Sequence, residues 1–182
     1  MCKHITVVLG LIVLVTHCAF ATEKAELEKR VQNYVKAGKE VVEMAVAKKL
    51  DIAVAEKDLK ACVEEAKWFC AEYAKAFPKG EKLLKTVVDN EPAMEKLAFK
   101  ELESEWHDGG YFTKHDVGVN LKEEENEHFT DPIHSLVHPL LVLRAAHDYG
   151  TSKSDEDLKK IKEEMEEGIE QAEKLKAALE KK

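Results

Sequence analysis

Glycine and proline are scarce in this chain outside a few places, and between those places apolar residues recur every three or four positions. Residues 23–50 show the pattern clearly, with apolar side chains at Leu27, Val31 and Val35. This spacing places the apolar side chains on one face of a helix, whereas a half-buried strand needs strict alternation. No segment shows such alternation with comparable strength. The pattern therefore predicts an all-α fold.

A small number of breaks divides the chain into helices. Proline and glycine at 78–80 end one helix because proline cannot continue the backbone hydrogen bonds. Asp131 and Pro132 are suited to a helix start, and Gly150 to a helix stop. We expect helices over residues 23–50, 51–77, 81–106 (with a break or kink before Pro92), 131–149 and from 154 onward.

The last of these helices has the spacing of a bundle or coiled-coil helix. Ser154 is a suitable N-cap, and Asp157 three residues later completes a capping-box pattern. Its apolar positions follow a 3–4 repeat in which Gly168 occupies one place. We expect one domain, residues 22–182, folded as an all-α bundle of four or five helices with one long loop at about 107–130.

The first 21 residues have the pattern of a secretory signal peptide. A short basic start is followed by an apolar run over 5–15 and by Ala-Phe-Ala at 19–21, a small-x-small cleavage site. Cys18 is an alternative lipidation site, but the preceding His17 is bulky where such sites require a small residue. We expect cleavage after residue 21, no membrane span, and a secreted or periplasmic protein.

The charge balance bears on possible partners. The chain carries 28 basic and 36 acidic residues, a net charge of −8, and contains no basic block. Such a chain is poorly suited to nucleic acid or to anionic lipid, because both attract positive charge. We therefore expect a metal ion or a protein as the partner.

Two cysteines, Cys62 and Cys70, follow the signal sequence. They lie in one predicted helix, so eight residues separate them by about 12 Å. A disulfide requires Cα atoms within about 7 Å, so the two cannot pair while the helix is intact. We expect two buried thiols. The alternative is an intermolecular bridge, and oligomers could form through Cys62 and Cys70 or through the last helix.

Histidines are concentrated in one part of the chain: all six that follow the signal sequence lie between His107 and His147, in the company of acidic residues. His134 and His138 are four residues apart, so a helix places them on one face, close enough to bind one ion. Pro139 removes the hydrogen bond to the carbonyl of Ser135, which then needs another partner. Imidazole and carboxylate together suit zinc, nickel, copper or iron.

Three further residues could supplement this pair. His128 and Asp131 lie at the start of the same helix, and His115 lies in the long loop, a kind of segment that is often functional. His147 falls on roughly the opposite helix face from His138 and is not expected to join. The alternative is that the pair packs against the loop and binds nothing.

The sequence favours a metal-binding protein, with a transition metal ion preferred to haem. A non-catalytic module that docks a protein partner is the second interpretation, and a hydrolase or oxidase the third. Glu125 and His128 form one Glu-x-x-His, but a di-iron bundle needs two such motifs. Ser135 has no nucleophile-elbow motif around it that would indicate a hydrolase.

Overall fold

The computed structural model describes the backbone of residues 5–182 and the side chains of residues 24–182. No strand occurs within residues 5–182, so the prediction of an all-α fold is confirmed. The α-helices are α1 (Ile5–Val46), α2 (Ile52–Ala76), α3 (Glu81–Met94), α4 (Phe99–Leu102), α5 (Gly110–Lys114), α6 (Thr130–Ser152) and α7 (Asp155–Leu179). Short 3-10 turns cover Pro78–Gly80 and Glu124–Phe129, and a π turn covers Glu103–His107.

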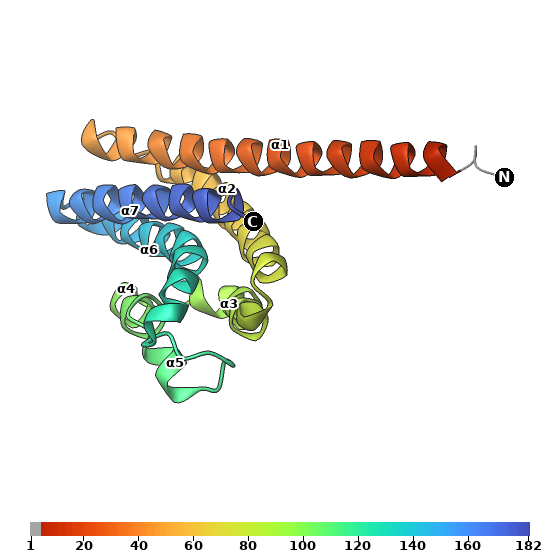
Figure 1. Ribbon diagram of the computed structural model, residues 1–182. Coiled ribbons are helices and arrows are strands. Elements are labelled where there is room, and N and C mark those ends of the chain that lie inside the picture. The colour runs from red at the N-terminus through yellow and green to blue at the C-terminus, as the bar shows by residue number, and fades with distance from the viewer. Residues whose placement is uncertain (1–4) are drawn as a thin grey trace.

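The four long helices form a bundle in which each helix packs mainly against two others. The contacts run from α1 to α2, from α2 to α6, from α6 to α7, and from α7 back to α1. The shorter helices α3, α4 and α5 lie together at one end of this bundle, below α6 in the view of Figure 1. A bundle of long helices with a small helical cap is therefore the architecture that positions every other feature.

Two helix starts are confirmed by their capping bonds. The Asp51 carboxylate accepts hydrogen bonds from the backbone N–H groups of Ala53 and Val54, at 3.0 and 3.1 Å, and so caps α2. The Ser154 hydroxyl accepts from the N–H of Asp157 at 3.1 Å and caps α7. In both cases a short polar side chain satisfies N–H groups that the helix itself leaves unpaired.

The expected number of helices was too low: the described residues hold seven α-helices. The segment 107–130 is not one open loop, because α5 and a 3-10 turn lie within it. The break near Pro92 falls after the proline, since α3 continues to Met94. Buried Met94 and an ion pair of buried Glu91 with Lys67, at 2.6 Å, hold this last turn against the bundle.

The predicted stop at Gly150 is also wrong, since α6 continues to Ser152 and ends at Lys153 in the left-handed conformation. Gly150 lies close to the side chain of Ile52. A Cβ atom at this position would lie 2.8 Å from the Cδ1 of Ile52, which is closer than real Cβ contacts allow. Glycine here lets α6 approach the start of α2.

The carbonyl that Pro139 deprives of its helix partner is satisfied by another helix. Tyr34 of α1 is fully buried, and its hydroxyl donates to the Ser135 carbonyl at 2.7 Å. Gly168 of α7 packs over this bond, and a Cβ atom there would lie 2.9 Å from both the Tyr34 hydroxyl and the His138 Cβ. The glycine in the repeat of the last helix is thus required where three helices meet.

Both thiols are buried in α2 and are free. Cys62 donates to the carbonyl of Tyr34, and Cys70 donates to that of Pro132, at 3.5 and 3.4 Å. Burial raises the pKa of each thiol to about 12. The prediction that the two do not pair within one chain is confirmed, and neither reaches the surface for an intermolecular bridge.

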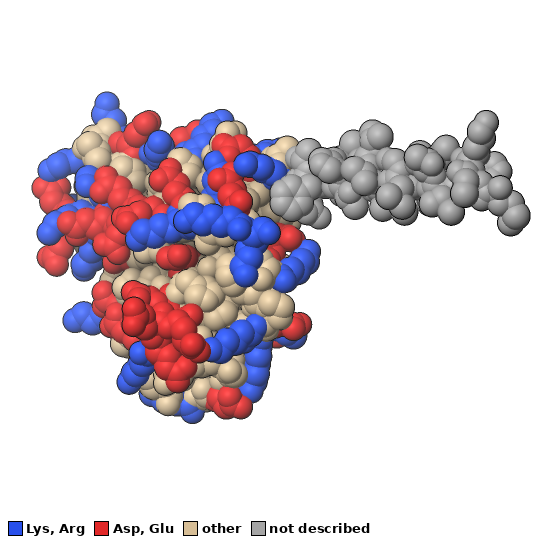
Figure 2. Space-filling model, in the orientation of Figure 1, with Lys and Arg blue, Asp and Glu red and all other residues tan. Residues whose placement is uncertain are grey.

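The surface is charged and mixed. Figure 2 shows lysines interspersed with acidic side chains over α1 and α7. Pairs one helical turn apart, such as Lys162 with Glu166 at 2.6 Å, account for part of this pattern. Within residues 24–182, no helix combines the length and the apolar character needed to cross a bilayer. The predicted signal peptide (residues 1–21) lies outside the residues whose side chains are described, and it stays a prediction.

Replacing Tyr34 with phenylalanine should lower the free energy of unfolding by about 1–3 kcal/mol, because the buried Ser135 carbonyl loses the hydroxyl that donates to it. Urea unfolding followed by circular dichroism measures this change. The matched control is Tyr149→Phe, since Tyr149 is only partly buried and its hydroxyl makes no hydrogen bond within the described residues. A Tyr34→Phe protein as stable as the control would contradict the assignment.

The buried thiols should be unreactive in the native protein. A thiol with a pKa of about 12 is almost wholly protonated at pH 8, and only the thiolate attacks disulfide reagents. We expect an aromatic disulfide reagent to modify neither Cys62 nor Cys70 until denaturant unfolds the chain. Rapid modification of the folded protein would mean that α2 is not packed as described.

Candidate metal centre

A widened helical turn brings His107 to the bundle. In the π turn Glu103–His107 the N–H of Asp108 donates to the Glu103 carbonyl at 2.8 Å, five residues back. Such turns are rare and are frequent at functional sites. Trp106 is buried, and the His107 ring stacks on that of His134 with centroids 4.5 Å apart and planes 12° apart. The turn therefore adds one histidine to the pair on α6.

The three imidazoles of His107, His134 and His138 form a compact group. The His138 ring centroid lies 5.0 Å from that of His107 and 5.6 Å from that of His134. One ligand nitrogen of each residue lies within 4.8 Å of those of the other two, and no other group of this kind occurs within the described residues. Metal–nitrogen bonds of about 2.0–2.1 Å in tetrahedral geometry need nitrogens about 3.4 Å apart. Side-chain rotations that shorten these separations by up to about 1.4 Å would meet this requirement.

Hydrogen bonds determine which ring nitrogens are free. Nδ1 of His138 lies 2.9 Å from the Glu164 carboxylate, and Nδ1 of His107 lies 3.1 Å from that of Asp108. Nε2 of His134 lies 3.2 Å from the backbone carbonyl of His107. Carboxylate and carbonyl oxygens only accept, so each of these nitrogens carries the proton. In the neutral ring the other nitrogen then has a free lone pair, as metal ligation requires.

His138 Nε2 is the least satisfied of these atoms. His138 is 0 % exposed, and its Nε2 is buried without a hydrogen-bond partner. The nearest carboxylate oxygen, from Glu167 of α7, is 3.9 Å away, too far for a hydrogen bond. A buried acceptor without a donor costs about 1–3 kcal/mol, so a ligand at this nitrogen would remove a penalty.

The surroundings of His134 favour its neutral form. Burial, together with the nearby rings of His107 and His138, lowers the pKa of His134 to about 4. His134 is therefore unprotonated at neutral pH, which leaves a nitrogen available to a metal.

The other residues expected to contribute make contacts of their own. Nδ1 of His128 lies 2.9 Å from the Tyr73 hydroxyl, and its ring packs on Phe129 with centroids 4.1 Å apart. Asp131 is half-buried at the start of α6, and burial raises its pKa. His115 is exposed and stacks on Tyr111 at 4.2 Å. None of the three belongs to the histidine group.

His107 was not among the expected ligands, although it begins the histidine-rich window. Its place in the group depends on the π turn and on the packing of that turn against α6. The spacing of apolar residues predicts neither of these. His147 is exposed, and its Nε2 lies 3.9 Å from the Glu56 carboxylate, away from the group as expected.

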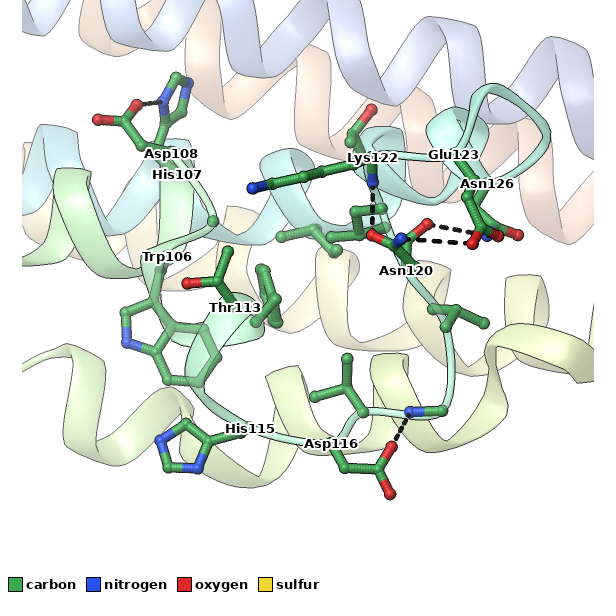
Figure 3. Close-up of a pocket in the computed structure, with 18 of the residues that line it drawn as sticks. Trp106, His107, Asp108, Thr113, His115, Asp116, Asn120, Lys122, Glu123 and Asn126 are labelled. Carbon is green, nitrogen blue, oxygen red and sulfur yellow. Dashed lines mark hydrogen bonds and ion pairs between the residues drawn. The ribbon is translucent and has the colours of Figure 1, made fainter.

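A cavity of about 750 Å³ opens beside the histidines (Figure 3). His107, Asp108 and His134 line it on one side, and the irregular segment 115–123 lines it on another. An ion pair between Asp116 and Lys82 at 2.8 Å holds this segment against α3. Two of the three grouped histidines therefore face a space large enough for a small molecule.

Comparison of the chain with models of known protein families, with curated proteins and with solved structures finds no match.

The lowered pKa of His134 predicts that the metal-free protein loses stability in acid. The unfolded histidine takes up its proton near pH 6.5, whereas the folded one does so only near pH 4. The folded state is therefore disfavoured progressively as pH falls from about 6.5 to about 4, by up to about 3 kcal/mol. Urea unfolding in EDTA at pH 7 and pH 4.5 measures this difference.

The free energy of unfolding of the variant His134→Gln should fall by about 2 kcal/mol less than that of the parent between these two pH values, because Gln does not titrate. His115→Gln is the matched control, since His115 is exposed, and it should behave like the parent. Equal losses in all three proteins would show that His134 titrates normally.

Proposed function

We propose that this protein binds a divalent transition metal ion through His107, His134 and His138. The observation that carries the proposal is the buried, unpartnered Nε2 of His138 within a group whose ligand nitrogens are mutually within 4.8 Å. Side-chain packing alone gives no reason to bury a nitrogen lone pair beside two further imidazoles.

The surrounding carboxylates support the proposal. Metal-binding histidines usually donate their second ring N–H to a carboxylate or a carbonyl, which orients the ring and makes it a better ligand. Glu164 provides this for His138, Asp108 for His107, and the His107 carbonyl for His134. Each histidine thus has the outer partner that a ligating histidine requires, and the carboxylates also balance the charge of a cation.

The donor set suggests which metals fit. Three neutral imidazoles suit zinc, nickel, copper or iron, and suit calcium or magnesium poorly because those ions prefer oxygen. An ion is preferred to haem, because haem takes its axial ligands on opposite faces of a flat ring, whereas three imidazoles here crowd around one point.

Added zinc, nickel or copper should raise the melting temperature of protein purified without a histidine tag. A metal that binds only the folded state at a hundredfold excess over Kd adds about 2.7 kcal/mol. For a chain of this size that corresponds to a rise of about 5–10 °C. His107→Ala and His134→Ala should each abolish most of the rise, whereas His115→Ala should keep it.

Each variant is compared with itself, with and without metal, so a change in basal stability does not affect the result. If no metal raises the parent's melting temperature, or if His115→Ala loses the rise as fully as His107→Ala, the proposed site is wrong.

The outer carboxylate can be tested separately. Glu164→Gln should weaken metal binding by about tenfold to a hundredfold, because the amide orients His138 less strongly and removes a negative charge. Glu163→Gln is the matched control: the same change on the same helix, at a residue that is 51 % exposed and pairs with Lys159. Calorimetric titration with zinc measures the affinity of both variants. If Glu164→Gln binds zinc as tightly as Glu163→Gln, Glu164 does not contribute to the site.

A further inference from the structure

The cavity and the histidine group share a wall. His107 and His134 line the cavity, whereas His138 is fully buried among the helices behind them. The group contains three ligand residues and no fourth within the described residues. Metal sites with three protein ligands keep one coordination position open to water or to a substrate. Because His107 and His134 line the cavity, a metal held here would have its open position on the cavity side.

The charged side chains that line the cavity are positive in one part and negative in another. Lys122 lines it, and its amine makes no ion pair within the described residues. In Figure 3 the Lys122 side chain extends toward the side on which His107 lies. With a divalent metal, that side carries the positive charges of both the metal and the amine. It is suited to an anionic group.

Asn126 lines the same cavity and has an unpartnered acceptor atom. It is 0 % exposed, and its Nδ2 donates to the Asn120 carbonyl at 2.9 Å and to the Glu123 carboxylate at 3.0 Å. Its Oδ1 is buried and has no partner. These two bonds identify Nδ2 as the donor end, so the unpartnered atom is an acceptor that requires an N–H or O–H from a ligand.

Much of the rest of the lining is apolar and partly aromatic. The lining side chains of this kind are Trp106, Phe112, Val117, Val119, Leu121 and Ile133. A cavity of about 750 Å³ lies within the range of about 300–1,000 Å³ that is typical of small-molecule sites. The other lining residues are mostly charged or polar, so the cavity combines an apolar wall with several polar groups.

We propose that this cavity binds a small carboxylate with an aromatic body and a hydrogen-bond donor. The carboxylate occupies the open position on the metal and pairs with Lys122, the ring packs on the apolar wall, and the donor bonds Asn126 Oδ1. The inference rests on the proposed metal site. The acidic residues of the lining do not oppose it: Asp108 bonds His107, Asp116 pairs with Lys82, and Glu123 bonds Asn126.

The test is calorimetric titration of 4-hydroxyphenylacetate into zinc-loaded and metal-free protein. We expect binding to the zinc-loaded form to be at least tenfold tighter, because the carboxylate loses the metal in the other form. Phenylacetate, which lacks the donor, should bind several-fold more weakly, since Asn126 Oδ1 is then left unpaired. 4-Methylphenol, which lacks the carboxylate, should bind no better with zinc than without it.

A cavity-filling variant locates the ligand. Thr113 lines the cavity but is exposed, so Thr113→Trp should fold while its ring occupies ligand space. Thr151→Trp is the matched control at an exposed position outside the cavity. We expect Thr113→Trp to lose carboxylate binding by tenfold or more while it keeps the zinc-dependent rise in melting temperature, and Thr151→Trp to keep both.

The outcomes separate the two proposals. Zinc binding without carboxylate binding overturns this inference and leaves the metal site standing, whereas absence of zinc binding overturns the metal site and the inference with it. Equal carboxylate affinity with and without zinc also overturns the inference. If phenylacetate binds as tightly as 4-hydroxyphenylacetate, Asn126 does not bond the ligand. If Thr113→Trp binds the carboxylate as tightly as the parent does, the ligand binds outside this cavity. The comparison among ligands needs no variant and holds even if Thr113→Trp fails to fold.

Discussion

A single hydrogen bond from the Tyr34 hydroxyl to the Ser135 carbonyl joins α1 to α6, and these two residues are 101 positions apart in the chain. The bond exists because Pro139 cannot donate to that carbonyl, and a carbonyl buried without a donor is costly. An aromatic side chain from α1 thereby compensates for a proline in α6. The same stretch of α6 carries His134 and His138, so the bond holds the segment that the candidate site is built on.

Packing of α7 against this segment completes the arrangement. Gly168 allows the backbone of α7 to approach the Cβ of His138 and the Tyr34 hydroxyl. Glu164, one turn earlier on α7, then reaches Nδ1 of His138 and fixes the tautomer that leaves Nε2 free. The chemistry of His138 is thus set by a helix with no histidine of its own, while the His107 turn covers the site from the other side.

The parts of this account that depend on local pattern could be predicted from the sequence. Three-and-four spacing identifies the long helices, the Asp51 and Ser154 caps mark two of their starts, and the His134–His138 spacing identifies half of the site. His107 could not be assigned because a π turn follows no simple periodicity and its partner residues are distant in sequence. His128 illustrates the converse: close in sequence to the pair, it is held by Tyr73 on another helix.

The claim that three imidazoles converge on one ion can be examined directly by X-ray absorption spectroscopy of the zinc-loaded protein. The account predicts three imidazole nitrogens at about 2.0–2.1 Å, with the outer-ring scattering typical of histidine, and one further light atom. It also predicts that one imidazole is lost in His107→Ala. A first shell that contains sulfur, or an oxygen-only shell with no imidazole scattering, would contradict the account.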